Sequence, residues 1–179
     1  MDRPGGVLLD LDGTIYEADR VVPGAPEAVA RLRRAGLAVA FCTNTTRMPR
    51  RALGERLAAL RIPAVPGEIV TAPAAAAAWL RAEGIRRVAL YVAEATLEEF
   101  PDCTLDDAAP EAVVLGDLAA GWTFAVLNRA FAGPGRATGL RAVLVRSGKY
   151  RVGDEATVTP APDAVVDSVA RLPALFGVE

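Results

Sequence analysis

Four polar residues stand where two predicted strands end. Asp10 and Asp12 close one apolar run, and Thr43 and Asn44 follow a second, which spans 37–42. Ligands of an open parallel sheet bind beyond the carboxyl ends of its strands, so we expect these side chains to face one crevice. Carboxylate oxygens suit Mg²⁺, and hydroxyl, amide and backbone N–H donors can hold a phosphate. The pattern indicates phosphate transfer at a Mg²⁺ ion.

The elements that must position these residues follow from hydrophobic periodicity. An apolar run at 6–11 predicts a strand, and 26–35 predicts a helix that stops at Gly36. A second strand at 37–42 precedes a helix at 49–60. This alternation predicts an α/β fold with a parallel sheet and right-handed crossovers. The later predicted elements are strands at 69–71, 88–92, 112–115, 142–146 and 164–166, and helices at 73–83, 123–132 and 169–175.

Composition excludes several classes of protein. The 179 residues are 52% hydrophobic, which predicts one folded domain or a domain with an insertion. A net charge of −2 with interspersed signs offers no basic stripe, so we expect no nucleic-acid partner. No apolar run is long enough to span a bilayer and no signal peptide is evident, so we expect a cytoplasmic protein without membrane contact.

Two residue types are nearly or wholly absent. The chain has no histidine, which excludes histidine-based triads and histidine-ligated metal sites. Lys149 is the single lysine, so a mechanism that needs a lysine has one candidate. Cys42 and Cys103 lie too far apart in sequence for any familiar metal-ligand spacing.

Several motifs, in order, resemble one superfamily. The run 10–14 (Asp-Leu-Asp-Gly-Thr) resembles the first motif of the haloacid dehalogenase (HAD) superfamily, and 41–46 (Phe-Cys-Thr-Asn-Thr-Thr) resembles its second. Residues 69–71, before an alanine-rich helix, resemble the start of the large α/β cap of the type IIA subgroup. The stretch 116–131 points to the branch of phospholysine phosphohistidine inorganic pyrophosphate phosphatases, and 144–150 resembles the late core strand and its loop.

This resemblance implies a fold and a set of roles. It implies a HAD-like Rossmannoid core formed by 1–70 and 136–179, interrupted by a truncated α/β cap at 71–135. The implied activity is Mg²⁺-dependent hydrolysis of a small phosphorylated molecule through an aspartyl-phosphate intermediate.

The resemblance also assigns the four residues. Asp10 would be the nucleophile, and Asp12 would be the general acid and then the base. Both would be Mg²⁺ ligands, Asp12 partly through its backbone carbonyl. Thr43 and Asn44 would bind the transferring phosphoryl group.

Two motifs of the superfamily are missing. Relatives carry a lysine beside the nucleophile and an acidic pair on the metal, both between the cap and the late strand at 142–146. This chain passes from Phe131 through 133–135 almost directly to 137–140, and Lys149 belongs to the later loop. Because a cation beside the transferring group contributes several kcal/mol, we expect impaired activity.

The missing acidic strand also has a structural consequence. In relatives it lies beside the first strand, so its loss predicts either a pairing of the first strand with the last or an exposed apolar edge. An exposed edge favours association, so we expect a homodimer as one outcome.

Other interpretations stay open. Asp10 and Asp12 would also fit a solvated turn after a strand, and Thr43 and Asn44 would fit caps of the following helix. For the whole chain the alternative is a catalytically inactive member that binds phosphate or a protein, or an internally deleted product without a function.

Overall fold

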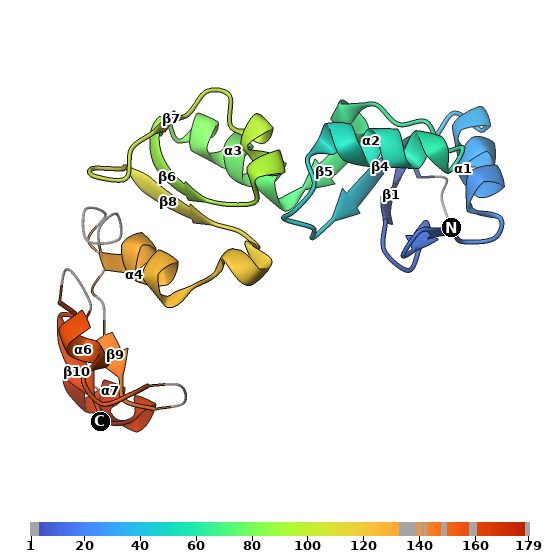
Figure 1. The fold of residues 1–179 in the computed structure, drawn as a ribbon. Coiled ribbons are helices and arrows are strands. Elements are labelled where there is room, and N and C mark those ends of the chain that lie inside the picture. Colours follow the sequence, from blue (N-terminus) through green and yellow to red (C-terminus); the bar gives the residue numbers. More distant parts are fainter. Residues whose placement is uncertain are drawn as a thin grey trace. The chain divides into compact units, whose positions relative to one another are not determined.

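A three-stranded parallel sheet carries the four candidate residues. In the computed structural model, β1 (Gly6–Asp10) pairs with β4 (Ala38–Thr43), and β4 pairs with β5 (Ile69–Thr71), all in parallel (Figure 1). The structure describes residues 4–132, 139, 141, 143–147, 150–157 and 161–177. The predicted α/β class with a parallel sheet is confirmed.

One face of this sheet is covered by helices α1 (Ala25–Arg34) and α2 (Arg50–Ala59). The two helices pack against β4 and β5 respectively. Alternate residues of a strand point to opposite faces, and the side chains that enter the core are those of one alternation. The buried apolar side chains from these elements include Val29, Val39, Phe41, Leu53, Leu57 and Ile69.

A glycine ends α1 and directs the chain into β4. Gly36 has a φ of +78°, a conformation that residues with a Cβ rarely adopt, and its N–H donates to the Arg33 carbonyl at 2.9 Å. The Leu37 N–H donates to the Leu32 carbonyl at 3.2 Å, which completes a Schellman-type ending. The predicted glycine stop is therefore present.

Apolar side chains on the opposite face of this sheet are exposed in the part of the chain that the structure describes. Leu8 is 63% exposed and Val70 is 45% exposed. Leu8 and its neighbours Ala38 and Ala40 line an open hollow of about 520 Å³. Among the described residues no strand pairs with the outer edge of β1. Whether the first strand pairs with the last strand or keeps an exposed apolar edge stays a prediction.

The sheet is followed directly by α3 (Ala72–Ala82). Thr71, which is 1% exposed, caps this helix because its hydroxyl accepts the Ala74 N–H at 3.2 Å. Two further short elements belong to the same part of the chain. They are η1 (Pro66–Glu68), a 3₁₀ turn before β5, and η2 (Glu94–Glu99), a longer 3₁₀ segment.

A second parallel sheet has β6 (Arg87–Tyr91) between β7 (Thr104–Leu105) and β8 (Ala112–Leu115). After the turn η3 (Ala119–Gly121) comes α4 (Phe124–Ala132). The buried apolar cluster between β6 and α4 consists of Ala89, Tyr91 and Ala130, and Trp122 packs against it.

The last described segments form a smaller parallel pair. β9 (Val143–Val145) pairs with β10 (Ala164–Val166), with α6 (Asp154–Thr157) between them in sequence. The chain then forms η4 (Val169–Arg171) and α7 (Leu172–Leu175). Arg146 holds this region together through ion pairs with Glu155 at 2.7 Å and Asp167 at 3.4 Å.

By their contacts the residues fall into two compact units. One comprises Met1–Gly84 and Val92–Asp102, and the other comprises Ile85–Tyr91 and Cys103–Glu179. The predicted boundary between cap and core at 135/136 lies outside the described residues, so the division into core and truncated cap stays a prediction. Within the described part of the chain, no helix combines the length and apolarity needed to cross a bilayer.

Candidate active site

Asp10 and Asp12 lie on either side of a core anchor. Asp10 is the last residue of β1, and both carboxylate-bearing residues are exposed. Leu11 between them is fully buried in the helix-covered core. Because Leu11 is fixed in the core, its two neighbours are held at the carboxyl end of the strand, at the solvent side.

The turn after Asp12 is held by backbone hydrogen bonds. Gly13 has a φ of +75°, which a residue with a side chain would adopt only with strain. Its N–H donates to the Tyr16 carbonyl at 2.7 Å, and the Ile15 N–H donates to the Leu11 carbonyl at 2.9 Å. The chain then forms the small antiparallel hairpin of β2 (Tyr16–Glu17) and β3 (Arg20–Val21). The turn is ordered, and Asp12, Gly13 and Thr14 in it are exposed, so the solvated-turn interpretation of the two acids stays open.

Thr43 and Asn44 lie at the same edge of the sheet as the two acids. In the register of β1 and β4, Asp10 lies opposite Cys42, one residue before Thr43. Thr43 is 5% exposed and its Oγ1 accepts the Thr45 N–H at 3.2 Å. Asn44 is exposed. The structure therefore brings the ends of the two motif strands together, while the roles of the four residues stay predictions.

Thr43 and Asn44 do not cap the next helix. The N-cap of α2 is Pro49, and no side chain in the adjacent loop accepts a hydrogen bond there. The Thr43 oxygen is instead used within its own turn by Thr45. The helix-cap interpretation of Thr43 and Asn44 is thus wrong for α2.

Sequence reasoning missed Tyr16 and Arg56 beside the site. Tyr16 is 2% exposed, and burial, followed by the nearby Asp12 carboxylate, raises the pKa of its phenol. The Arg56 guanidinium lies 4.1 Å from the centre of the Tyr16 ring and acts in the opposite direction on that pKa. Arg56 also donates to the Ala18 carbonyl, which fixes the hairpin to α2. The only sequence signal is that Tyr16 lies four residues beyond Asp12.

The donors at this edge suit Mg²⁺ chemically. The Asp10 carboxylate and the Asp12 backbone carbonyl can supply hard oxygen ligands, and Mg²⁺ in proteins is commonly held by one or two carboxylates, several waters and the substrate phosphate. Among the described residues no group of three or more acidic or cysteine side chains gathers as a complete metal site. Lys149 lies outside the described residues. The fit is therefore to a Mg²⁺ ion held in part by a phosphorylated ligand.

Comparison with known proteins decides the family. The family model for haloacid dehalogenase-like hydrolases matches residues 7–105, which include the whole candidate site. This chain belongs to the haloacid dehalogenase-like hydrolases. A second, HAD-hydrolase-like model matches residues 133–172. The resemblance drawn from the motifs is thereby confirmed.

Several proteins that are similar to this HAD chain are named as phosphatases. Rat phospholysine phosphohistidine inorganic pyrophosphate phosphatase is 39% identical over 130 residues, which cover 70% of this chain and 47% of the relative. A p-nitrophenyl phosphatase from Archaeoglobus fulgidus superposes with a TM-score of 0.68 at 22% identity, covering 98% of this chain and 75% of that one. Glycerol phosphate phosphatase from Mycobacterium tuberculosis, solved with magnesium, superposes with a TM-score of 0.62 at 25% identity. The match covers 76% of this chain and 42% of that one.

The length of the HAD chain differs from that of its relatives. It spans about half the length of the curated relatives that it matches. The two matched segments are separated by residues 106–132. The absence of the motif lysine and of the acidic pair before the late strand stays a prediction from the motifs.

Proposed function

We propose that this chain is a Mg²⁺-dependent HAD-type phosphatase that hydrolyses a small phosphorylated molecule, with low turnover. The observation that supports it is the register of β1 and β4, which places Asp10 opposite Cys42 and so beside Thr43. Membership of the family and the phosphatase relatives support the reaction class.

The first chemical step uses Asp10 and Asp12. A carboxylate oxygen of Asp10 attacks phosphorus, and the bond from phosphorus to the leaving oxygen breaks. Asp12, protonated at this stage, donates its proton to that leaving oxygen. The product is an alcohol, or phosphate from a pyrophosphate, together with an aspartyl phosphate on Asp10.

Hydrolysis restores the protein. Water attacks phosphorus, the bond from phosphorus to the Asp10 oxygen breaks, and the Asp12 carboxylate takes a proton from the water. Inorganic phosphate leaves and Asp10 returns as a carboxylate. Asp12 is again protonated and ready for the next substrate.

Thr43 and Asn44 hold the phosphoryl oxygens during both steps. The Thr43 Oγ1 already accepts the Thr45 N–H, so its own O–H hydrogen is left to donate to a phosphoryl oxygen. The exposed Asn44 amide offers two more donors. Mg²⁺, held by the Asp10 carboxylate and the Asp12 backbone carbonyl, would offset the repulsion between the Asp10 carboxylate and the anionic substrate.

Low turnover follows from the predicted loss of the motif lysine and the distal acids. Removing one preorganised charge-stabilising group typically lowers a rate by about 10²–10³. We therefore expect slow hydrolysis. A chain with no turnover would fit the alternative, an inactive phosphate- or protein-binding module.

The test is phosphate release from p-nitrophenyl phosphate with and without Mg²⁺. We expect slow, Mg²⁺-dependent release that falls to the background rate in Asp10→Asn. Asp19→Asn is the matched control, because Asp19 is a fully exposed carboxylate on the neighbouring hairpin. Release that is unaffected by Asp10→Asn would overturn the proposal, and no release by the folded parent would favour the inactive module.

A further inference from the structure

Glu99 is a charged residue with an unusual position. Its side chain is 4% exposed, although it ends the 3₁₀ segment η2. A buried carboxylate is unfavourable unless it is paired and hydrogen-bonded. Its partners therefore indicate what it does.

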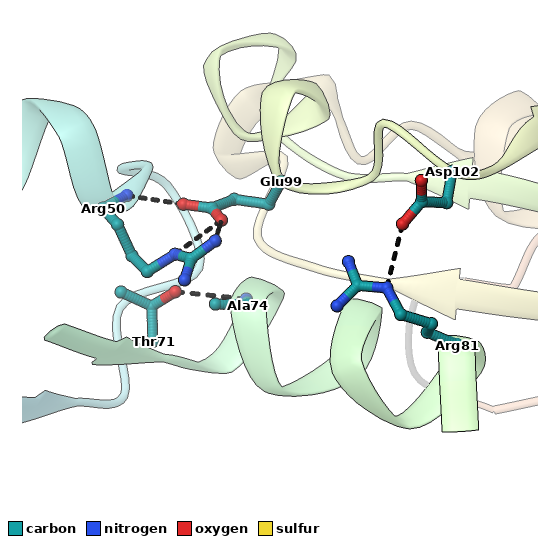
Figure 2. A network of polar contacts seen from close by, with 6 residues as sticks. All are labelled: Arg50, Thr71, Ala74, Arg81, Glu99 and Asp102. Carbon is teal, nitrogen blue, oxygen red and sulfur yellow. Dashed lines mark hydrogen bonds and ion pairs between the residues drawn. The ribbon is translucent and has the colours of Figure 1, made fainter. Parts of the chain in front are cut away.

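Within the described residues, the polar partners of Glu99 belong to Arg50, the first residue of α2 (Figure 2). One carboxylate oxygen accepts the Arg50 backbone N–H at 2.6 Å. The other accepts Arg50 Nε at 2.8 Å and lies 2.8 Å from the terminal guanidinium nitrogen. The carboxylate thus accepts hydrogen bonds from both the backbone and the side chain of Arg50.

This contact supplies the cap that α2 lacks locally. The helix begins after Pro49, which has no side-chain acceptor, and its first turn contains no acidic residue. A carboxylate at a helix N-terminus satisfies free N–H groups and interacts favourably with the helix dipole. Glu99 provides that carboxylate from 49 residues further along the chain.

The capped end of α2 is also the end of the phosphate-binding loop of the proposed site. This loop runs from Thr43, at the end of β4, to Pro49. Thr43 and Pro49 are both buried, so the loop is fixed at its two ends. Asn44 and the Thr45 N–H lie between these fixed ends, and Glu99 stabilises the second of them.

Neighbouring polar contacts keep Glu99 in place. The hydroxyl of Thr96, which is fully buried, donates to the Ala93 carbonyl at 2.7 Å and so orders η2. Asp102 pairs with Arg81 at 2.9 Å just beyond Glu99 (Figure 2). Glu98, by contrast, makes only an exposed pair with Arg51 at 3.3 Å.

We propose that Glu99 is a positioning residue for the phosphate-binding loop 43–49. It acts through Arg50 and the first turn of α2, and it does not touch the substrate. This inference rests on the proposed function for the part that concerns phosphate affinity. The order of the loop can be measured without that assumption.

The experiment compares Glu99→Gln with Glu98→Gln in the full chain. Amide hydrogen exchange of Thr45 reports the order of the loop, since this N–H donates to Thr43 Oγ1. Binding of inorganic phosphate in the presence of Mg²⁺, followed by calorimetry, reports the site. We expect Glu99→Gln to accelerate Thr45 exchange and to weaken phosphate binding, each by about tenfold, the size of effect of losing a helix cap. Glu98→Gln should leave both within about twofold.

Unchanged Thr45 exchange in folded Glu99→Gln, with only the Arg50 amide exchanging faster, would overturn the inference and leave Glu99 as a helix cap alone. If Glu99→Gln does not fold, Glu99→Asp, which keeps the charge but shortens the reach, gives the same comparison. We then expect at least about threefold faster Thr45 exchange, and no change would be equally decisive against the inference. A parent that binds no phosphate would contradict the proposed function, while Thr45 exchange would still decide the role of Glu99.

Discussion

Asp10 lies opposite Cys42 in the parallel register of β1 and β4. This single pairing brings two motifs that are separated by α1 to one edge of the sheet. We call Asp10, Asp12, Thr43 and Asn44 together the half-site. All four residues belong to one compact unit.

Mg²⁺ binding should depend on phosphate. The half-site offers the Asp10 carboxylate and the Asp12 backbone carbonyl, so the ion needs phosphate oxygens to complete its shell. We expect Mg²⁺ to bind at least about tenfold more tightly when inorganic phosphate is present. Calorimetric titrations with and without phosphate measure this difference. Asp10→Asn should abolish it and Asp19→Asn should preserve it, whereas equal affinities with and without phosphate would contradict the shared site.

The core under the half-site should be sensitive to truncation. Leu57 is fully buried beneath the sheet, so Leu57→Ala should lower the free energy of unfolding by about 2–5 kcal/mol. Val65, which is 62% exposed in the same unit, is the control. Val65→Ala should change that free energy by less than about 0.5 kcal/mol. Urea denaturation followed by circular dichroism makes the comparison, and similar values for the two variants would show that this core does not support the fold.

Glu155 should titrate at unusually low pH. The Tyr150 hydroxyl donates to it at 2.6 Å, and with the Arg146 guanidinium this lowers the pKa of Glu155 to about 2. A carboxyl whose pKa is lower in the folded state stabilises the fold above its unfolded pKa near 4.5. That contribution is lost as the pH falls from about 4.5 towards 2.

Carbon NMR of the side-chain carboxyl measures this pKa directly. Tyr150→Phe removes the largest cause of the shift, so the pKa of Glu155 should rise in that variant. An unchanged midpoint in Tyr150→Phe would assign the low pKa to the backbone N–H of Glu155 and to Arg146.

The exposed edge of β1 should show alternating amide exchange. The Gly5 carbonyl accepts the Ala38 N–H, so the N–H groups of Val7 and Leu9 face β4 and that of Leu8 faces outwards. In dilute protein we expect Leu8 to exchange at least about tenfold faster than Val7 and Leu9.

The predicted homodimer would make the exchange rate of the Leu8 amide depend on protein concentration. If two copies associate through this edge, the Leu8 amide becomes protected as the protein concentration rises. Exchange at Leu8 that is slow at every concentration would mean that a segment of the same chain occupies the edge. Exchange that is fast at every concentration would speak against a dimer through β1.

Local patterns predicted most elements well. The strands β5 and β8 have their predicted bounds, and α1 and α3 differ from prediction by one residue at each end. These elements are governed by alternation or by glycine and threonine caps, which are visible in sequence. The predicted helix at 169–175 instead begins as the 3₁₀ turn η4. Pro173 has no N–H to donate to Val169, so a continuous α-helix cannot form there.

Two kinds of feature were not predictable from the sequence: a turn without the usual turn residues, and contacts between distant residues. The hairpin of β2 and β3 turns at Ala18, which has a φ of +49° and carries no glycine or proline signal. The buried pair of Glu99 and Arg50 joins residues 49 positions apart, and no local pattern encodes it. Phe131 is 42% exposed, although large aromatic side chains are usually well buried. Which distant charges pair, and how far a side chain is buried, depend on the assembled fold, so a local sequence pattern does not predict them.

The uncovered edge of β1 also bears on how the chain is made. The half-site ends at Asn44, and the core beneath it is complete once Ile69 has been added. Domains fold from the N-terminal side during synthesis, at about 5–20 residues per second. The sheet can therefore form while later residues are still being added, with the edge of β1 open throughout. Chaperones that bind extended apolar chain would have a defined target on the nascent protein during that interval.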